Sequence, residues 1–231
     1  NRELFENTAH RYTLSGTLKW NITKWMSVTG RARLDNTVMN YTRKIYASSN
    51  KLYASEFGNY QDNTIMHNNF YGDILLTIDK KFVDDKLSLT ANLGASLVDD
   101  KNKASGFEGH LATVANKFSV YNISMTHSQT KPYADRWHDQ NQAVYGTLQL
   151  GWNGMVYVDG TVRNDWSSQL AFTPDQSVCY YSVGLSGVIS SMADLSGAGI
   201  SFLKVRGSYS TAGNPPQRFI TGVNTPLTVG G

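Results

Sequence analysis

The 231-residue chain is 40% hydrophobic and 17% charged, with a formal net charge of +3. This composition excludes disordered and collagen-like chains, and no run of basic residues predicts a nucleic-acid surface. The single cysteine, Cys179, excludes an internal disulfide, and no apolar run approaches the ~20 residues that a membrane-spanning helix needs.

The first predicted element is a strand at residues 12–20, where apolar residues or glycine alternate with polar residues. A period of two indicates an extended strand with one apolar and one polar face. The same alternation returns at residues 26–34, after a turn at 21–24. These two segments predict a pair of strands joined by a short turn.

Six further segments of the same kind follow along the chain. They lie at about residues 69–80, 87–98, 144–150, 156–162, 181–189 and 203–209. Short turns are expected at 83–86, at 151–154 and before the last strand, and long polar loops at 35–67, 99–141 and 164–178. Alternating short and long connections are typical of outer-membrane barrels, with periplasmic turns and extracellular loops.

The alternation alone also fits a soluble barrel whose apolar face points inward. Two features favour the membrane. The polar face carries charged residues from the first strand to the last, as a water-filled lumen requires, and aromatic residues stand at the short turns, where an interfacial belt would lie. The charged residues are Arg11, Lys19, Arg31, Arg33, Asp73, Asp79, Asp159, Arg163, Lys204 and Arg206, and the aromatic ones Trp20, Trp25, Phe82 and Trp152.

Three segments in the last third of the chain resemble one family. They are residues 162–170 (VRNDWSSQL), 180–186 (YYSVGLS) and 203–214 (LKVRGSYSTAGN). In this order they are similar to the barrel of the SusC/RagA family, the TonB-dependent outer-membrane transporters of Bacteroidetes. The resemblance implies that residues 1–231 are one partial domain, an all-β antiparallel transmembrane barrel segment of about eight strands. The complete barrel would have about 22 strands, and the plug, the TonB box and the terminal strand are expected outside this segment.

The same resemblance implies a function in the bacterial outer membrane. Members import oligosaccharides or peptides, with a SusD-like surface lipoprotein over the mouth of the barrel and TonB acting through the missing N-terminal part. Expected partners are therefore this lipoprotein, TonB, outer-membrane lipid and the substrate, with no nucleic acid and no cofactor. A non-energised porin or receptor barrel and a soluble β-barrel ligand-binding module stay open as alternatives.

Aromatic residues of the expected long loops are candidates for substrate binding, because their rings offer stacking surfaces. Packing within the loops or contact with a lipoprotein would use the same residues. A second group, Asp159, Arg163 and Asp165, shares one face of a strand and predicts lumenal ion pairing across strands. The loop candidates are Tyr41, Tyr46, Tyr53, Tyr60, Tyr133 and Trp137.

Catalysis and metal binding find little support in the sequence. The five histidines lack ligand spacing, and no serine or cysteine stands in a nucleophile motif. Carboxylate pairs at 84–85 and 99–100 lie at strand ends, where such residues usually interact with water. We therefore expect no catalytic residues, no metal site and no enzymatic activity.

Overall fold

The computed structural model describes residues 2–50, 52, 54–128, 130–174, 176–193, 197 and 199–213. These residues divide into two compact units. The first comprises residues 2–14, 33–70 and 99–138, and the second comprises 15–32, 71–98 and the described residues from 139 onward.

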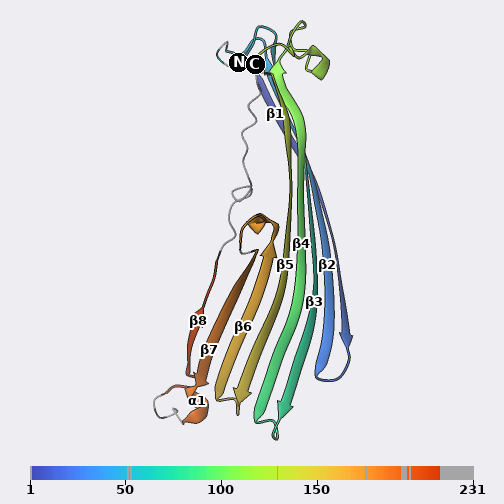
Figure 1. Ribbon diagram of the computed structural model, residues 1–231. Coiled ribbons are helices and arrows are strands. Elements are labelled where there is room, and N and C mark those ends of the chain that lie inside the picture. Colours follow the sequence, from blue (N-terminus) through green and yellow to red (C-terminus); the bar gives the residue numbers. More distant parts are fainter. Residues whose placement is uncertain are drawn as a thin grey trace. The chain divides into compact units, whose positions relative to one another are not determined.

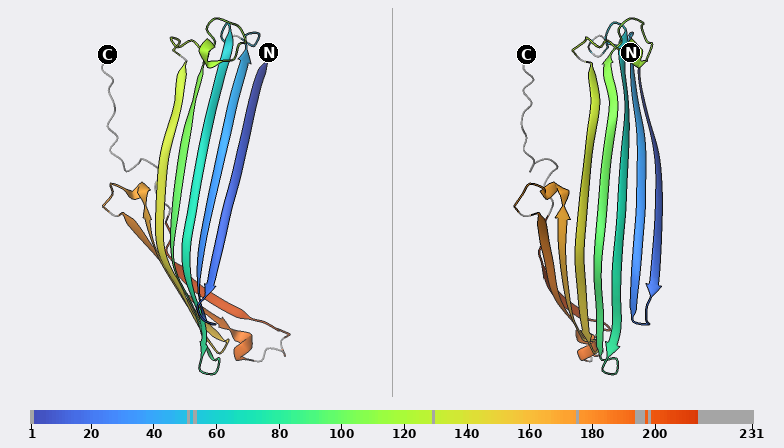
Figure 2. Two further views of the ribbon diagram at one scale, coloured as in Figure 1. Left: turned by 90° about the vertical axis from the view of Figure 1, so that its right-hand side faces the viewer. Right: turned by 45° about the vertical axis from the view of Figure 1, so that its right-hand side comes forward.

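Eight strands form one sheet in the order β1-β2-β3-β4-β5-β6-β7-β8, each hydrogen-bonded to the next (Figure 1). Figure 2 shows the same succession from two further sides, from blue β1 to red β8. The predicted all-β fold with eight strands is confirmed. The strands are β1 (Glu3–Asn21), β2 (Met26–Tyr46), β3 (Gly58–Phe82), β4 (Leu87–His110), β5 (Lys131–Trp152), β6 (Val156–Ser167), β7 (Ser177–Val188) and β8 (Lys204–Ser210).

The helical elements whose full bounds lie within the described residues are single turns. They are η1 (Val120–Asn122), η2 (Ser168–Leu170) and α1 (Ile189–Met192). None of the helices in the described part of the chain is long and apolar enough to cross a membrane.

The long strands correct the predicted loops. Connections expected at 35–67, 99–141 and 164–178 shrink to 47–57, 111–130 and 168–176, because β2 to β6 continue through residues without alternation. The connection before β8 covers 189–203 and is longer than expected. Alternation in the sequence identifies only those strand segments that have one apolar and one polar face. A strand that is polar on both faces still satisfies its backbone groups on its neighbours, so it continues without that pattern.

The register of β5 to β8 aligns the two faces across the strands. Leu150 pairs with Val158, which pairs with Leu185, and the next apolar row joins Leu148, Gly160, Val183 and Tyr209. The intervening rows are polar, for example Thr147, Thr161, Ser182 and Ser210. The large side chains of the apolar rows are exposed. One face of the sheet is therefore an exposed apolar band, as the alternation predicts.

The short turn between β5 and β6 uses left-handed backbone. Asn153 and Gly154 have φ of 51° and 69°, and the Met155 amide donates to the Trp152 carbonyl at 2.9 Å. Asn-Gly suits a two-residue hairpin turn because both residues tolerate positive φ. The turn predicted at 151–154 is confirmed.

The connection at 111–130 in the first unit is ordered around Asn122, which is 5% exposed. Its amide Nδ2 donates to the carbonyls of Val114 and Lys117, and its Oδ1 accepts from the Val114 amide. Leu111 bridges to Ile123, and both are buried. This connection is therefore packed against its own strands rather than being an open loop.

Candidate functional site

A hydrogen-bonded row crosses the polar face of the second unit. The Thr77 hydroxyl donates to Asn92 Oδ1 at 2.9 Å, and Asn92 Nδ2 donates to the Thr147 hydroxyl at 3.0 Å. Thr147 pairs in register with Thr161, whose hydroxyl lies 2.6 Å from that of Ser182. Side-chain hydrogen bonds thus connect β3 to β4, β4 to β5 and β6 to β7, and the row of hydroxyl and amide groups leaves a hydrophilic surface.

Asp73 is the most enclosed charge on this face, with a side chain that is 0% exposed. Arg31 Nε donates to its Oδ1 at 2.9 Å, and the Tyr71 hydroxyl donates to its Oδ2 at 2.7 Å. A buried carboxylate is tolerated when such partners compensate for lost hydration. Arg31, Tyr71 and Asp73 therefore tie β2 to β3.

Tyr145 of β5 lies across Gly94 of β4. A Cβ atom at Gly94 would come within 2.5 Å of the tyrosine ring. The Arg163 guanidinium stands 5.6 Å from the centroid of this ring, within the range of a cation–π interaction. Glycine at position 94 thus makes room for an aromatic side chain that Arg163 covers.

The predicted Asp159, Arg163 and Asp165 group contains an ion pair. Arg163 Nε donates to Asp165 Oδ1 at 2.7 Å, so the pair forms within β6 and not across strands. Asp159 makes no ion pair with any described residue, and its carboxylate lies over Gly184 of β7. This pair forms because side chains two residues apart on a strand lie on the same face and reach each other. Cross-strand pairing by this group stays a prediction.

A cavity of about 360 Å³ opens beside Arg163 on the polar face. The Arg163 side chain is 48% exposed, and only its Nε–H group donates to Asp165. Its remaining N–H groups can bind a carboxylate, a carbonyl or a hydroxyl. We call this cavity the Arg163 pocket; it is lined by Ser96, Val98, Asn141, Gln142, Ala143, Arg163, Asp165, Ser167, Leu170, Val178, Tyr180 and Gly213.

Two of the predicted loop aromatics meet in the first unit. The rings of Tyr46 and Phe118 lie 4.9 Å apart, and those of Tyr60 and Phe118 lie 5.9 Å apart. Tyr60 also contacts Phe107 at 5.5 Å. Burial raises the pKa of Tyr60, as does its hydroxyl contact with Asp62. Tyr46 and Tyr60 therefore hold the connection at 111–130 onto the strands.

The other aromatic candidates are separate. Tyr133 is 43% exposed near the start of β5, and Tyr41 is half-buried on β2. The Trp137 ring lies 5.8 Å from His67. Tyr53 lies outside the described residues. Substrate binding by these residues stays a prediction.

The sequence reasoning missed two imidazole–carboxylate contacts between β3, β4 and β5 in the first unit, which lie on opposite faces of the sheet because Asp99 and Asp100 are consecutive in β4. His67 Nε2 lies 2.6 Å from Asp100 Oδ1, and His138 Nε2 lies 2.7 Å from Asp99 Oδ2. Lys101 contacts Asp99 at 2.8 Å. Hydrogen bonds from Lys101 and His138 lower the pKa of Asp99. Only the pairing of strands brings together residues more than 30 positions apart, so no local pattern could reveal them.

No cluster of three or more histidine, cysteine, aspartate or glutamate side chains within the described ranges could hold a metal ion.

Exposed aromatic rings accompany the short turns of the second unit. Trp20, Trp25, Phe82 and Trp152 are all exposed. Lys80 Nζ lies 4.8 Å from the Trp25 ring centroid and 5.0 Å from that of Phe82. The long lysine side chain thus crosses two rings with its charge held above them.

The fold matches solved transporter structures. The RagAB peptide importer in its "open-open" state has a TM-score of 0.79 and 19% sequence identity, over 92% of this chain and 23% of that chain. Its "closed-closed" state gives the same values, and the RagAB peptide transporter has a TM-score of 0.73 with equal identity and coverage. The chain has the fold of the matched part of these transporters.

The resemblance found in the sequence is thereby confirmed at the level of the fold. The chain spans 23% of the length of the chains that it matches. Neither a protein-family model nor a curated protein sequence matches it.

Proposed function

We propose that this chain forms part of the barrel wall of a TonB-dependent transporter of the SusC/RagA family in the bacterial outer membrane. The main observation in support of this proposal is the fold that 92% of the chain shares with the RagAB structures. The exposed apolar rows of the sheet suit contact with lipid, and the opposite rows of hydroxyl, amide and charged groups suit a hydrated lumen.

The proposed activity is uptake of peptides or oligosaccharides rather than catalysis. The Arg163 pocket offers hydrogen-bond donors for carboxylate, carbonyl or hydroxyl groups, which both substrate classes carry. A SusD-like surface lipoprotein is the proposed partner. In support, the matched structures are those of the RagAB peptide importer, whose name combines two components, RagA and RagB.

The proposed topology places the connections at 47–57 and 111–130 outside the cell and the turns at 22–25, 83–86 and 153–155 in the periplasm. The aromatic rings at the short turns support a place for these turns at a membrane interface, because tryptophan is enriched at both interfaces. The choice of side rests on the lengths of the connections. Long extracellular and short periplasmic connections are the rule in such barrels.

Cysteine labelling tests this topology in the full-length protein carrying Cys179→Ser. Asn50→Cys and Lys117→Cys, both at exposed positions, should react with an impermeant maleimide on intact cells, and Asp84→Cys should react only after lysis. Labelling of Asp84→Cys alone on intact cells would invert the topology. Recovery of the unlabelled protein in the soluble fraction would refute membrane insertion.

The energised mechanism needs its own test. Uptake of a peptide or oligosaccharide mixture by cells that express the full-length protein should stop when TonB is deleted. Uptake that continues unchanged without TonB would favour a passive porin, since a porin needs no energy source.

A further inference from the structure

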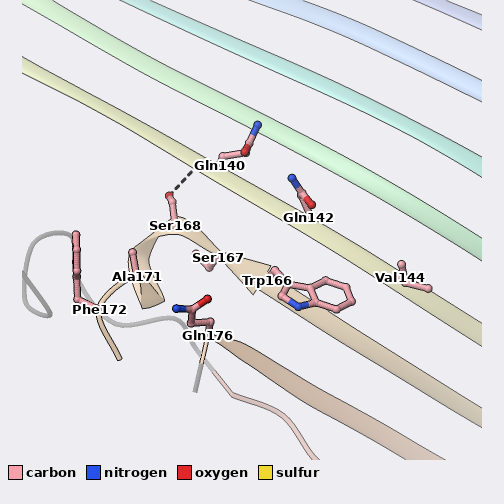
Figure 3. A pocket seen from close by; sticks show the side chains of 9 residues that line it. All are labelled: Gln140, Gln142, Val144, Trp166, Ser167, Ser168, Ala171, Phe172 and Gln176. Carbon is pink, nitrogen blue, oxygen red and sulfur yellow. Dashed lines mark hydrogen bonds between the residues drawn. The ribbon is translucent and has the colours of Figure 1, made fainter. Parts of the chain in front are cut away.

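One hollow of the second unit lies on the apolar face and not on the polar one. Its volume is about 740 Å³. Gln142 of β5 pairs in register with Trp166 of β6, and both share their strand face with Val144 (Figure 3). The hollow therefore opens on the same side as the exposed apolar band, where the band gives way to polar side chains. It is lined by Gln140, Gln142, Val144, Trp166, Ser167, Ser168, Ala171, Phe172 and Gln176.

The described lining of this hollow is polar but uncharged. Three glutamines supply amide donors and acceptors, two serines supply hydroxyls, and Trp166 and Phe172 supply exposed rings. An anionic phosphate would call for lysine or arginine, and none of the described lining residues is basic. Amides beside aromatic rings suit a neutral group with several hydroxyls, such as a sugar.

A second hollow adjoins the first and shares Val144 with it. Its volume is about 340 Å³. Its side chains are aliphatic, and alternation along β2, β3, β4 and β5 puts those of Val28, Ile74, Leu76, Leu93, Ala95 and Val144 on the apolar faces of their strands. Such a lining accommodates hydrocarbon and offers nothing to a polar ligand. It is formed by Val28, Ile74, Leu76, Leu93, Gly94, Ala95 and Val144.

We propose that the two hollows together bind one membrane lipid that carries an uncharged sugar headgroup. The sugar occupies the hollow of Gln142 and Trp166, and an acyl chain lies in the hollow of Leu76 and Ala95. The two hollows meet at Val144, and one has a neutral polar lining while the other has an apolar lining. A glycolipid has the same two parts in the same order, a neutral polar headgroup followed by an apolar acyl chain. The inference rests on the proposed function, because it requires the apolar face to meet a bilayer.

Native mass spectrometry of the full-length transporter tests the proposal. The protein is purified in lauryldimethylamine oxide, a detergent without a sugar. It is then offered monogalactosyl diacylglycerol, phosphatidylcholine and phosphatidylglycerol with identical acyl chains. The unmodified protein should retain the galactolipid in preference to both phospholipids.

Two variants separate the headgroup from the chain. Gln142→Leu should lower the preference for the galactolipid over phosphatidylcholine by roughly tenfold, as expected for the loss of one or two hydrogen bonds. Ala95→Leu fills the apolar hollow and should reduce retention of all three lipids. Gln149→Leu makes the same chemical change as Gln142→Leu on the opposite face of β5 and should leave the preference unchanged.

Equal retention of the three lipids by the unmodified protein would overturn the proposal. An equal loss in the Gln142→Leu and Gln149→Leu variants would overturn it too. Flotation with liposomes, measured on the same samples, separates this result from the proposed function. A protein that floats without selecting a lipid refutes only the glycolipid site, whereas a protein that fails to float refutes membrane insertion itself.

Discussion

Gly58, the first residue of β3, occupies a position that has no room for a side chain. Its φ is +100°, and a Cβ atom would lie 2.5 Å from the carbonyl oxygen of Ile45. The Leu111 amide donates to the Gly58 carbonyl at 2.8 Å, so the strand start is fixed on two sides. Such a backbone conformation favours glycine strongly.

Gly58→Ala should therefore destabilise the packed connection at 111–130 by about 1–3 kcal/mol, the cost of a strained backbone residue. Limited proteolysis of the full-length protein should detect faster cleavage within residues 111–130. Gly30→Ala is the matched control, because open space surrounds that strand glycine. Equal cleavage of the two variants would show that the approach to Ile45 imposes no constraint.

The lowered pKa of Asp99 predicts a dependence of stability on acid. The folded-state pKa lies below the unfolded value of about 3.9. The contribution of Asp99 is thus present above that value and is lost as pH falls through the folded pKa. The drop in Tm of the full-length protein between pH 6 and pH 3 should be smaller in Asp99→Asn than in the unmodified protein. An unchanged drop would contradict a stabilising role for the hydrogen bonds from Lys101 and His138.

At the scale of residues, the sequence revealed which side chains share a face but not which ones meet. The shared face of Arg163 and Asp165 followed from their spacing, and their pair forms within one strand. Arg31 and Asp73 lie 42 positions apart. Their contact depends on the register between β2 and β3, which the loop length leaves open. Long-range pairs of this kind need the structure.

At the scale of elements, the strands are longer than a bilayer requires. β3 has 25 residues and β4 has 24, whereas a transmembrane strand needs about 9–11. The alternating parts of these strands, at 69–80 and 87–98, have about that length, which is why the sequence revealed them. The rest of each strand lacks this alternation, so the sequence resembles a loop there although the backbone is paired.

The apolar band makes a directional prediction for single arginines. Leu93→Arg on the apolar face should destabilise the protein by about 2–4 kcal/mol in a bilayer, the cost of arginine near the midplane. Thr161→Arg on the polar face should cost much less, because its side chain points to water. Folding of the full-length protein into liposomes, titrated with urea, measures both variants. Equal costs on the two faces would refute the assignment of the apolar face to lipid.

At the scale of the whole molecule, the sheet ends in two strands that lack a second neighbour among the described residues. β1 borders only β2, and β8 borders only β7. All 19 residues of β1 and all seven residues of β8 are exposed. Unpaired edges of such length attract further strands, and closure into a barrel removes them. Further strands of the proposed barrel would pair with both edges.

Residues 1–231 expressed alone should therefore fail to form a stable monomer. In a bilayer each unpaired backbone group at an open edge costs several kcal/mol, because no water is present to satisfy it. In water the exposed apolar band and the free edge of β1 favour association between copies. Size-exclusion chromatography should show aggregates, and denaturant titration should show no cooperative transition, whereas the full-length transporter should fold in liposomes. A monomeric β protein that unfolds cooperatively in water would contradict the barrel-wall assignment and would favour a soluble ligand-binding module.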